Sequence, residues 1–528
     1  MLSTATSITS GRNYFGKLPG LLTVLALLIL GLFIYKDYGV AWDEVGQRNI
    51  GVANLQMIRS GDRSMLDGFA DKDHGAVFEL ALMSIEEAIN PATFREMIAI
   101  RHLCGFVFYL VGILCGYLLA LRLFQKQWIA LLGIAMLVLQ PRIFAHSFFN
   151  SKDVPFLVAM LIALYAVSAA FDRKRLYLFV FAGIACGLAA GIRTMGLLLM
   201  LLVGIMLLGD IILARGAPRK MLLWQTLAFT FSAIAALYTC WPTLWYDPLQ
   251  SLLDVLHRQS RYTAWKGGGL LFNGTIHPAT DLPWYYIPEW FCISTPLGWL
   301  ILGVAGIFLC CRRVFKRPFV SLDDLKTRML LICAACFVVP VIAVIAMRSV
   351  VYDDWRHLYF IYPPFVMIAL YAVDKLEARK WGKLAIGAIC ATQTITASAF
   401  MITAHPLQQV YFNPLVSHRP GYIRKHFVCD YWGLSYRLGL EYILAHDPRD
   451  TIKLVHYANT PLRENAFALP EPDRIRVHWT DNPREPGAYF LTTYRDHPED
   501  HFWPRVWAKQ VGGSTILEVY RIDSTGHY

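Results

Sequence analysis

Two adjacent carboxylates, Asp43 and Glu44, follow the first long apolar run of the chain by a few residues. A pair of acids beside a membrane surface loses solvation energy unless the acids are used or paired. A carboxylate in this place can take the proton from an attacking hydroxyl group, which is general base catalysis. The alternative is that these acids cap a helix or lie on the surface.

A second group of residues that could take part in chemistry is Lys152 and Asp153, at the start of a later apolar run. Asp153 and Pro155 are typical of the first turn of a helix, so a structural role alone would explain them. Lys152 and Asp153 also lie where the phosphate of a membrane lipid is expected.

Basic side chains in the segments that join other apolar runs form a third group. They are Arg101, Arg193, Arg356 and His357. The positive-inside rule makes arginines on the outer side of a membrane less expected. Arginine binds phosphate through a planar pair of donors and stays charged, so these residues are candidates for a lipid phosphate site. The alternative is pairing with Asp353 or Asp354, or with lipid headgroups.

The composition places these residues in a membrane protein. The chain has 528 residues, of which 56% are hydrophobic and 16% charged, whereas soluble proteins carry about 25% charged residues. The net charge of +11 would suit nucleic acid. However, the basic residues cluster in short loops between apolar runs, which favours a membrane protein and argues against nucleic acid.

About eleven apolar runs approach the length of a membrane-spanning helix. They are 20–36, 102–121, 127–140, 154–171, 176–192, 195–214, 221–240, 291–311, 329–347, 358–374 and 384–403. The first is interpreted as an uncleaved helix. Alternate short loops are basic, so we expect a cytoplasmic N-terminus and an outer C-terminus.

This topology predicts two parts, a helical membrane module at 1–403 and a small outer α/β domain at 404–528. Outer loops at 36–101 and 241–290 belong to the first part. Amphipathic helices are expected near Arg48–Ile58 and Val77–Ile89, and 241–290 is expected to be irregular. In the tail, alternation predicts strands at Thr451–His456, Arg474–Trp479, Tyr489–Tyr494 and Thr515–Arg521, with a helix at Leu434–Ala445.

Metal and disulfide chemistry has no clear signal in the sequence. Most of the eleven cysteines lie in apolar runs and are expected to be packing residues. No ligand cluster with metal spacing occurs, and no metal site is predicted. His74, in the first outer loop, is a candidate for contact with a substrate, as are Trp245 and Tyr246 in the aromatic outer loop.

These residues and the topology together resemble the GT-C superfamily of glycosyltransferases. The similarity is to the bacterial branch related to protein O-mannosyltransferases and to the lipid A aminoarabinose transferase. Asp43-Glu44 resembles the acidic pair of the first outer loop, and Arg101 the arginine that opens the second helix. The segments Asn150–Phe156 and Asp354–Tyr359 resemble those that open later helices, and His405–Asn413 with Asp430–Tyr436 is similar to a bacterial tail.

The resemblance implies a multi-pass enzyme of the inner (plasma) membrane that transfers a hexose or pentose outside the cytoplasm, with inversion. The donor would be a polyprenyl-phosphate sugar, and the acceptor a protein, lipid or glycan. Asp43 would be the base, with Glu44 assisting at the acceptor. His74, Trp245 and Tyr246 would line the acceptor cleft, although His74 lacks the family's following Pro-Pro-Leu. Some relatives use a divalent ion such as Mg²⁺ or Mn²⁺, so cofactor use stays open.

The five cationic candidates and Asp153 would hold the donor phosphate; they are Arg101, Lys152, Arg193, Arg356 and His357. The competing hypothesis is a transporter or flippase of lipid-linked saccharides. Such proteins often have internal repeats and ionisable groups deep in the membrane, which are not evident here. A scaffold whose tail binds an envelope partner would leave Asp43 and Glu44 without a role.

Overall fold

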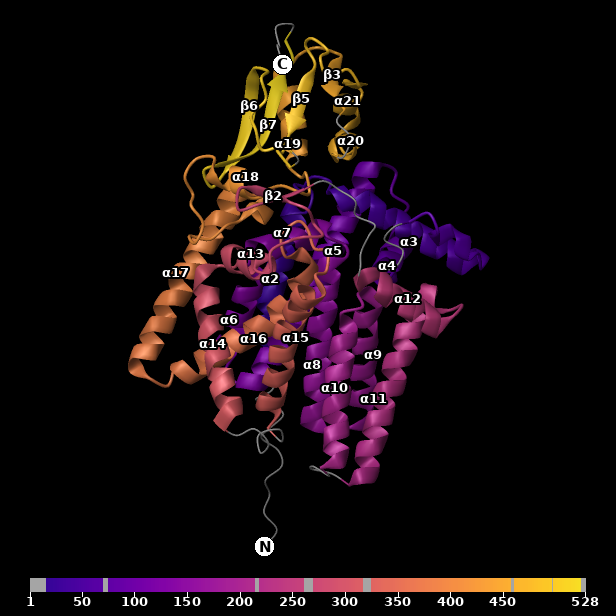
Figure 1. Ribbon diagram of the computed structural model, residues 1–528, viewed down its shortest axis with the longest axis vertical. Helices are drawn as coiled ribbons and strands as arrows, with labels where there is room; N and C mark the ends of the chain where they lie inside the picture. The colour runs from indigo at the N-terminus through magenta and orange to yellow at the C-terminus, as the bar shows by residue number, and fades with distance from the viewer. Residues whose placement is uncertain are drawn as a thin grey trace.

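The chain forms a module of long helices with a small sheet domain at one end (Figure 1). This computed structural model describes residues 16–69, 75–213, 218–260, 269–316, 324–456, 460–495 and 497–523. The first half of the chain contains α2 (Leu18–Ile34), α3 (Trp42–Ser60), η1 (Arg63–Leu66), α4 (Val77–Ile89), α5 (Phe94–Phe124), α6 (Gln127–Val138), α7 (Pro141–Phe149), α8 (Asp153–Arg173), α9 (Leu176–Ile192), α10 (Gly196–Ile212) and α11 (Arg219–Cys240).

The second half completes the helical module and then forms the tail domain. It contains η2 (Pro242–Leu244), α12 (Pro248–Ser260), β1 (Leu270–Phe272), β2 (Thr275–His277), α13 (Tyr286–Ser294), α14 (Leu297–Lys316), α15 (Leu325–Met347), η4 (Arg356–Ile361), α16 (Tyr362–Leu376), α17 (Lys380–Ala404), η5 (Gln408–Val410), α18 (Tyr422–His426), α19 (Tyr436–His446), β3 (Ile452–Val455), α20 (Leu462–Phe467), α21 (Glu471–Arg474), β4 (Val477–Thr480), β5 (Tyr489–Thr492), β6 (Arg505–Val511) and β7 (Ser514–Arg521).

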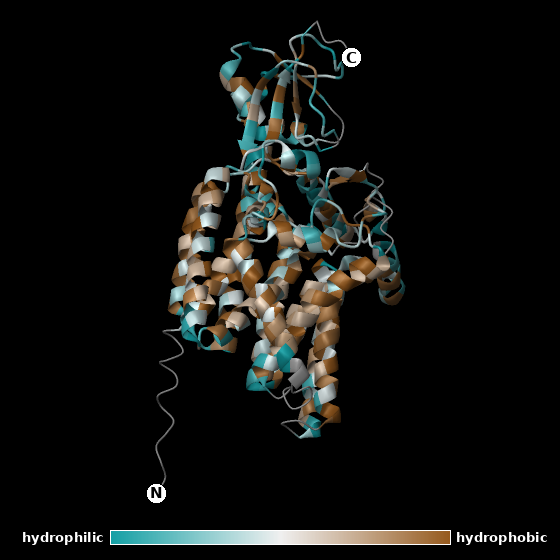
Figure 2. Ribbon diagram, turned by 60° about the vertical axis from the view of Figure 1, so that its left-hand side comes forward, coloured by the Kyte–Doolittle hydropathy of each residue, from teal (hydrophilic) through white to brown (hydrophobic). Residues whose placement is uncertain are grey.

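The helical module is that of a multi-pass membrane protein. Among the described residues, six helices are long and apolar enough to cross a membrane, or seven if the bent pair α6 and α7 is one span. Three further apolar helices, α2, α9 and α10, have 17 residues each. Each predicted apolar run coincides with a helix, and apolar residues dominate the long helices in Figure 2. The count of eleven crossings stays a prediction.

The predicted run at 127–140 is bent rather than straight. α6 and α7 meet at 67°, because Pro141 begins α7 and has no backbone N–H to continue the ladder of α6. The Gln140 side chain accepts a hydrogen bond from the backbone N–H of Arg142, 3.2 Å away. This cap turns α7 across the module, and every residue of α7 is buried.

Small residues bring α9 and α11 together. A side chain on Gly183 or Gly187 would collide with the backbone of α11 near Phe229 and Ala233. Four residues separate the two glycines, so both lie on one face of α9 and allow the close approach typical of membrane helices.

Basic residues that were expected in cytoplasmic loops gather at the end of the module opposite the tail domain (Figure 1). There, Lys126 at the start of α6 pairs with Asp374 near the end of α16, at 2.9 Å. Arg122 at the end of α5 pairs with Asp172 of α8, at 2.8 Å. The end that carries α3, α4 and the tail domain is therefore the candidate outer end.

The outer segments are more ordered than the sequence indicated. α3 and α4 form at the predicted amphipathic stretches. The expectation of an irregular loop at 241–290 is wrong in part, because this segment includes α12 and the antiparallel hairpin β1–β2. Aromatic side chains of this segment, such as Trp290, pack against the start of the tail domain, where Phe427 lies 5.3 Å away between ring centroids.

The tail domain is a five-stranded mixed sheet with the order β4-β3-β5-β7-β6. β3 pairs in parallel with β4 and β5, whereas β7 pairs antiparallel with β5 and β6. Apolar residues of α19, including Leu440 and Ile443, form a core with β3, β5 and β7. The four predicted strands and the predicted helix are present within a few residues, and β6 was missed.

Direct hydrogen bonds join the tail domain to the first outer loop. The Asn465 side chain in α20 accepts from the backbone N–H of Val40 and donates to its carbonyl, both at 2.9 Å. Arg437 donates to the Tyr38 carbonyl at 3.1 Å. These contacts fix the chain just before α3, and therefore fix Asp43 and Glu44.

Candidate active site

Arg356 is the centre of a buried charge cluster at the end of the module that carries the tail domain. It begins η4 and is 1% exposed. Its Nη1 lies 3.3 Å from Asp153 Oδ2 and 3.6 Å from Asp43 Oδ2, and its Nη2 lies 3.5 Å from Asp353 Oδ2. The guanidinium also stacks over Trp432, 4.7 Å from its ring centroid. The cluster thus joins the starts of α3 and α8 to η4 and the tail.

Asp43 is the accessible carboxylate of this cluster. Its side chain is 25% exposed, whereas that of Asp153 is 1% exposed. Lys152 Nζ lies 3.2 Å from Asp43 Oδ2. Asp153 is held by Arg193, by Arg356 and by Asn150 Nδ2 at 2.9 Å. Asp43 can therefore meet a substrate, and Asp153 orients the cations around it.

Glu44 has the helix-capping role that was the alternative for both acids. It is buried, and its Oε1 accepts from the backbone N–H of Ala41 at 2.7 Å. Its Oε2 faces His102 Nε2 at 2.9 Å. These contacts distinguish Glu44 from Asp43, because both oxygens of Glu44 already have partners; its implied role at the acceptor stays a prediction.

Arg101 lies in a separate ion-pair group. Its side chain is 3% exposed and binds Glu79 at 2.5 Å and Glu86 at 2.7 Å, which holds α4 against α5. Glu79 also accepts the hydroxyl of Ser151, one residue before Lys152. Arg101 is therefore linked to the cluster through Glu79 and Ser151, and its predicted contact with a donor phosphate stays a prediction.

A cavity of about 130 Å³ opens beside the cluster, and three of the predicted phosphate ligands line it. These are Lys152, Arg193 and His357. The rest of the wall is mainly apolar and includes Pro340 and Val344 of α15. Positive charge at one side and apolar side chains between helices at the other suit a ligand with an anionic head and a hydrocarbon chain.

A second buried polar group surrounds Asp354. Arg142 of α7 lies 3.0 Å from Asp354 Oδ2, and the hydroxyl of Tyr431 donates to the same oxygen at 2.8 Å. Burial raises the pKa of Asp354 to about 6, although Arg142 and Tyr431 act in the opposite direction. His146 Nε2 lies 3.3 Å from the Trp432 indole nitrogen. This group ties α7 to the tail beneath Arg356.

Of the three predicted acceptor residues, the structure describes Trp245 and Tyr246. His74 lies outside the described residues. Trp245 donates to the Tyr238 carbonyl at 2.7 Å, and Tyr246 donates to the Gly61 carbonyl at 2.6 Å. Both aromatic side chains remain partly exposed, at 37% and 49%.

Sequence reasoning missed Arg142 and His146, which belong to the buried polar group around Asp354, and Arg495, which pairs with Asp353. Arg142 had a usable signal, because an arginine after Gln-Pro inside an apolar run is costly unless it is buried with a partner. In the described segments, no group of three or more His, Cys, Asp or Glu side chains is arranged to hold a metal ion.

Comparison with known proteins gives one family match. Residues 94–246 match the family of dolichyl-phosphate-mannose-protein mannosyltransferases. This segment contains Lys152, Asp153 and Arg193. The resemblance to the GT-C glycosyltransferases is thereby confirmed over this part of the chain. No curated protein matches the sequence.

Two proteins of solved structure show similarity to this chain. ArnT from Cupriavidus metallidurans in the apo state has 15% identity and a TM-score of 0.45, over 94% of this chain and 97% of that chain. ArnT bound to undecaprenyl phosphate has 14% identity and a TM-score of 0.44, over the same shares. The oligosaccharyltransferase of Archaeoglobus fulgidus, tethered with an acceptor peptide, has 14% identity and a TM-score of 0.41, over 78% of this chain and 56% of that chain. The present chain thus spans little more than half the length of that enzyme.

Proposed function

We propose that this protein transfers a sugar from a polyprenyl-phosphate donor to a hydroxyl acceptor outside the cytoplasm, with Asp43 as the general base. One observation carries the proposal. Among the carboxylates described around Arg356, Asp43 is the one that is partly exposed, and its Oδ2 lies 3.2 Å from Lys152 Nζ. Lys152 in turn lines a cavity with cationic and apolar walls. A base and a site for a lipid phosphate are therefore adjacent.

The donor phosphate would bind between Lys152, Arg193 and His357, with Arg356 behind them. The first three line the cavity, and Arg356 is oriented by Asp153 and Asp353. Charge-assisted hydrogen bonds to phosphate are strong in such a partly desolvated place. The polyprenyl chain would follow the apolar wall formed by α15, including Pro340 and Val344. The family match over 94–246 supports a donor of this class.

Donor binding would also release the base. Without a donor, Asp43 is held by Lys152 and Arg356. The phosphodiester of the donor competes for both cations, because its two non-bridging oxygens share a negative charge and can accept from Lys152 and Arg356 together. Asp43 then becomes free to accept the proton of an acceptor hydroxyl. The base is thus masked until the donor is in place, which limits wasteful attack by water.

The transfer itself is one displacement at the anomeric carbon. The acceptor oxygen forms the new bond from the face opposite the phosphate, and its proton goes to Asp43. The bond from the anomeric carbon to the phosphate oxygen breaks, and polyprenyl phosphate leaves as an anion. Lys152, Arg193 and Arg356 stabilise the charge that grows on it. The sugar inverts its configuration.

The test is release of polyprenyl phosphate by the full-length protein in lipid nanodiscs. A panel of polyprenyl-phosphate hexoses and pentoses is offered with envelope extracts as acceptors, and the released lipid is quantified. Release with one donor supports the proposal and identifies the sugar. If folded protein binds a lipid-linked sugar, releases no polyprenyl phosphate from any donor and moves the intact donor across a bilayer, the transporter hypothesis replaces it.

A further inference from the structure

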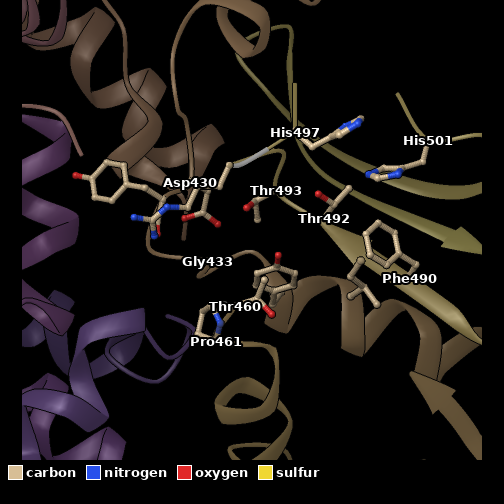
Figure 3. A pocket seen from close by; sticks show the side chains of 13 residues that line it. Asp430, Gly433, Thr460, Pro461, Phe490, Thr492, Thr493, His497 and His501 are labelled. Atoms are coloured by element: carbon tan, nitrogen blue, oxygen red, sulfur yellow. The ribbon is translucent and has the colours of Figure 1, made fainter. Parts of the chain in front are cut away.

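A second cavity, of about 90 Å³, lies where the tail domain meets the helical module. One wall is the strand β5 with the residues that follow it, including Thr492, Thr493 and Arg495. The opposite wall is the turn from Asp430 to Gly433 (Figure 3). Neither the proposed base nor the donor cations line this cavity, so it has no role in the mechanism above.

The cavity offers hydrogen-bonding groups. The hydroxyls of Thr492 and Thr493 lie between Asp430 and the two imidazoles of His497 and His501 in Figure 3. Thr492 Oγ1 accepts from the Tyr494 backbone N–H at 3.0 Å, which leaves its own proton to donate. Within the described part of the chain, His501 Nε2 is buried without a hydrogen-bond partner. A buried group of this kind is costly unless a ligand or water binds it.

The charged side chains of the wall already have polar partners. Arg495 binds both oxygens of Asp353, at 3.0 and 3.1 Å. Asp430 accepts from the Ser435 backbone N–H at 2.8 Å. Burial lowers the pKa of His501, so this imidazole is neutral at pH 7. A charged ligand would therefore have to compete with these partners for its counter-charge, and a neutral ligand is favoured.

Apolar faces complete the wall. Phe490 lies at one end of the cavity, and Tyr436 and Pro461 form part of its floor. A site that combines hydroxyl and imidazole groups with aromatic and proline faces suits a molecule with many hydroxyls and an apolar face of C–H groups. Carbohydrates have both properties.

The cavity is also joined to the candidate active site. The Trp432 carbonyl, in the turn that forms one wall, accepts from the backbone N–H of Trp42 at 3.1 Å. Trp42 directly precedes Asp43. A ligand that extends beyond the cavity along this turn therefore approaches the proposed base.

We propose that this cavity binds a neutral carbohydrate, which is the sugar portion of the acceptor. The assignment of this carbohydrate to the acceptor rests on the proposed function, whereas carbohydrate binding itself does not. Thr493 and His501 donate and accept hydrogen bonds to the ligand, and Phe490 contacts its apolar face. The acceptor is then a glycan or glycolipid rather than an unmodified protein side chain.

The test is ligand binding by the full-length protein in nanodiscs, measured by saturation-transfer NMR with methyl glycosides of common hexoses and pentoses. Two cavity variants, Thr493→Val and His501→Phe, are compared with Thr515→Val, a control in β7. We expect at least one glycoside to bind, and each cavity variant to weaken its binding about fivefold or more, the loss expected for a hydrogen bond. Thr515→Val should bind as the wild type does.

Two results would overturn the inference. One is that no methyl glycoside binds to the wild type. The other is that binding is unchanged in every folded cavity variant, as judged by circular dichroism. Since the assay needs no donor and no turnover, carbohydrate binding in a protein without transferase activity would reject the proposed function alone. Transfer activity without carbohydrate binding at this cavity would reject the inference alone.

Discussion

Arg495 of the tail domain lies 3.0 Å from Asp353, and the same carboxylate lies 3.5 Å from Arg356. The tail therefore contributes a counter-charge to the loop that positions the central arginine of the site. Asp353 and Asp354 both have positive φ, at 56° and 66°. Two consecutive non-glycine residues in this region are strained and need partners on both sides. Arg495 and Arg142 supply those partners.

Replacing Arg495 with Gln should weaken the use of donor more than it weakens the fold. Asp353 would lose its tail partner and shift toward Arg356, which competes with the donor phosphate. We expect kcat/KM for the donor to fall about tenfold, equivalent to roughly 1.4 kcal/mol. Steady-state kinetics with varied donor measures this. Arg505→Gln is the matched control, since Arg505 pairs with Glu518 within the tail sheet at 2.9 Å. Equal losses in both variants would contradict a specific role for Arg495.

Replacing Lys152 with Ala should raise the KM for the donor. Lys152 lines the donor cavity and is largely buried, with 8% of its side chain exposed. Loss of one charge-assisted contact to phosphate should cost about 2 kcal/mol, or roughly 30-fold in donor affinity. Lys126→Ala, at the opposite end of the module, is the control. An unchanged donor KM in Lys152→Ala, measured in nanodiscs, would remove this residue from the phosphate site.

Substitution of Glu44 should lower the stability of the protein, whereas substitution of Asp43 should lower the transfer rate. Glu44→Ala removes the cap of α3 and leaves the Ala41 N–H and His102 without their partner, at a cost of about 1–3 kcal/mol. We expect a lower thermal unfolding midpoint and a nearly normal rate per folded molecule. Differential scanning fluorimetry beside initial rates measures the two. A variant of normal stability that transfers no sugar would restore Glu44 to the chemistry.

The stability of the protein should fall as the pH rises, because the pKa of the buried Asp354 carboxyl group is raised. Its pKa is raised to about 6, above the value of about 4 in an unfolded chain. The folded protein holds this proton more tightly, so the contribution to stability is full below pH 4 and is lost as the pH rises through 6. The wild type should therefore lose up to about 3 kcal/mol relative to Asp354→Asn between pH 4 and 7. The difference in thermal unfolding midpoint between the wild type and Asp354→Asn should therefore change across this pH range. A difference that stays constant would contradict a raised pKa of Asp354 in the folded protein.

The helical architecture was predictable because membrane helices leave a direct signal, which is a run of apolar residues of sufficient length. The start of α8 was predictable from Asp153 and Pro155. The bend at Pro141 was not predicted, although the residue that causes it is visible in the sequence. Helix α12 was missed, although its leucines at 249, 252, 253 and 256 recur at helical spacing.

The site was predictable in part. Lys152, Arg193 and His357 do lie around one cavity, and the alternative partner of Arg356, Asp353, is indeed in contact with it. The different surroundings of Asp43 and Glu44 were not predictable, because adjacent acids look equivalent in sequence, whereas successive residues of a helix point about 100° apart. Arg495 lies 142 residues after Asp353 in the chain. Packing of the tail alone brings them together, and no local pattern indicates it.

The most direct test of the central claim is the single-turnover rate of Asp43→Asn, measured in nanodiscs beside Asp37→Asn. Asp37 is a second acid of the same outer loop that pairs with His405 at 2.8 Å. The account predicts that Asp43→Asn binds the donor but transfers sugar at least about 100-fold more slowly, the usual contribution of a general base. Asp37→Asn should retain normal transfer. Transfer by folded Asp43→Asn at the wild-type rate would contradict the account, because no base would then be assigned.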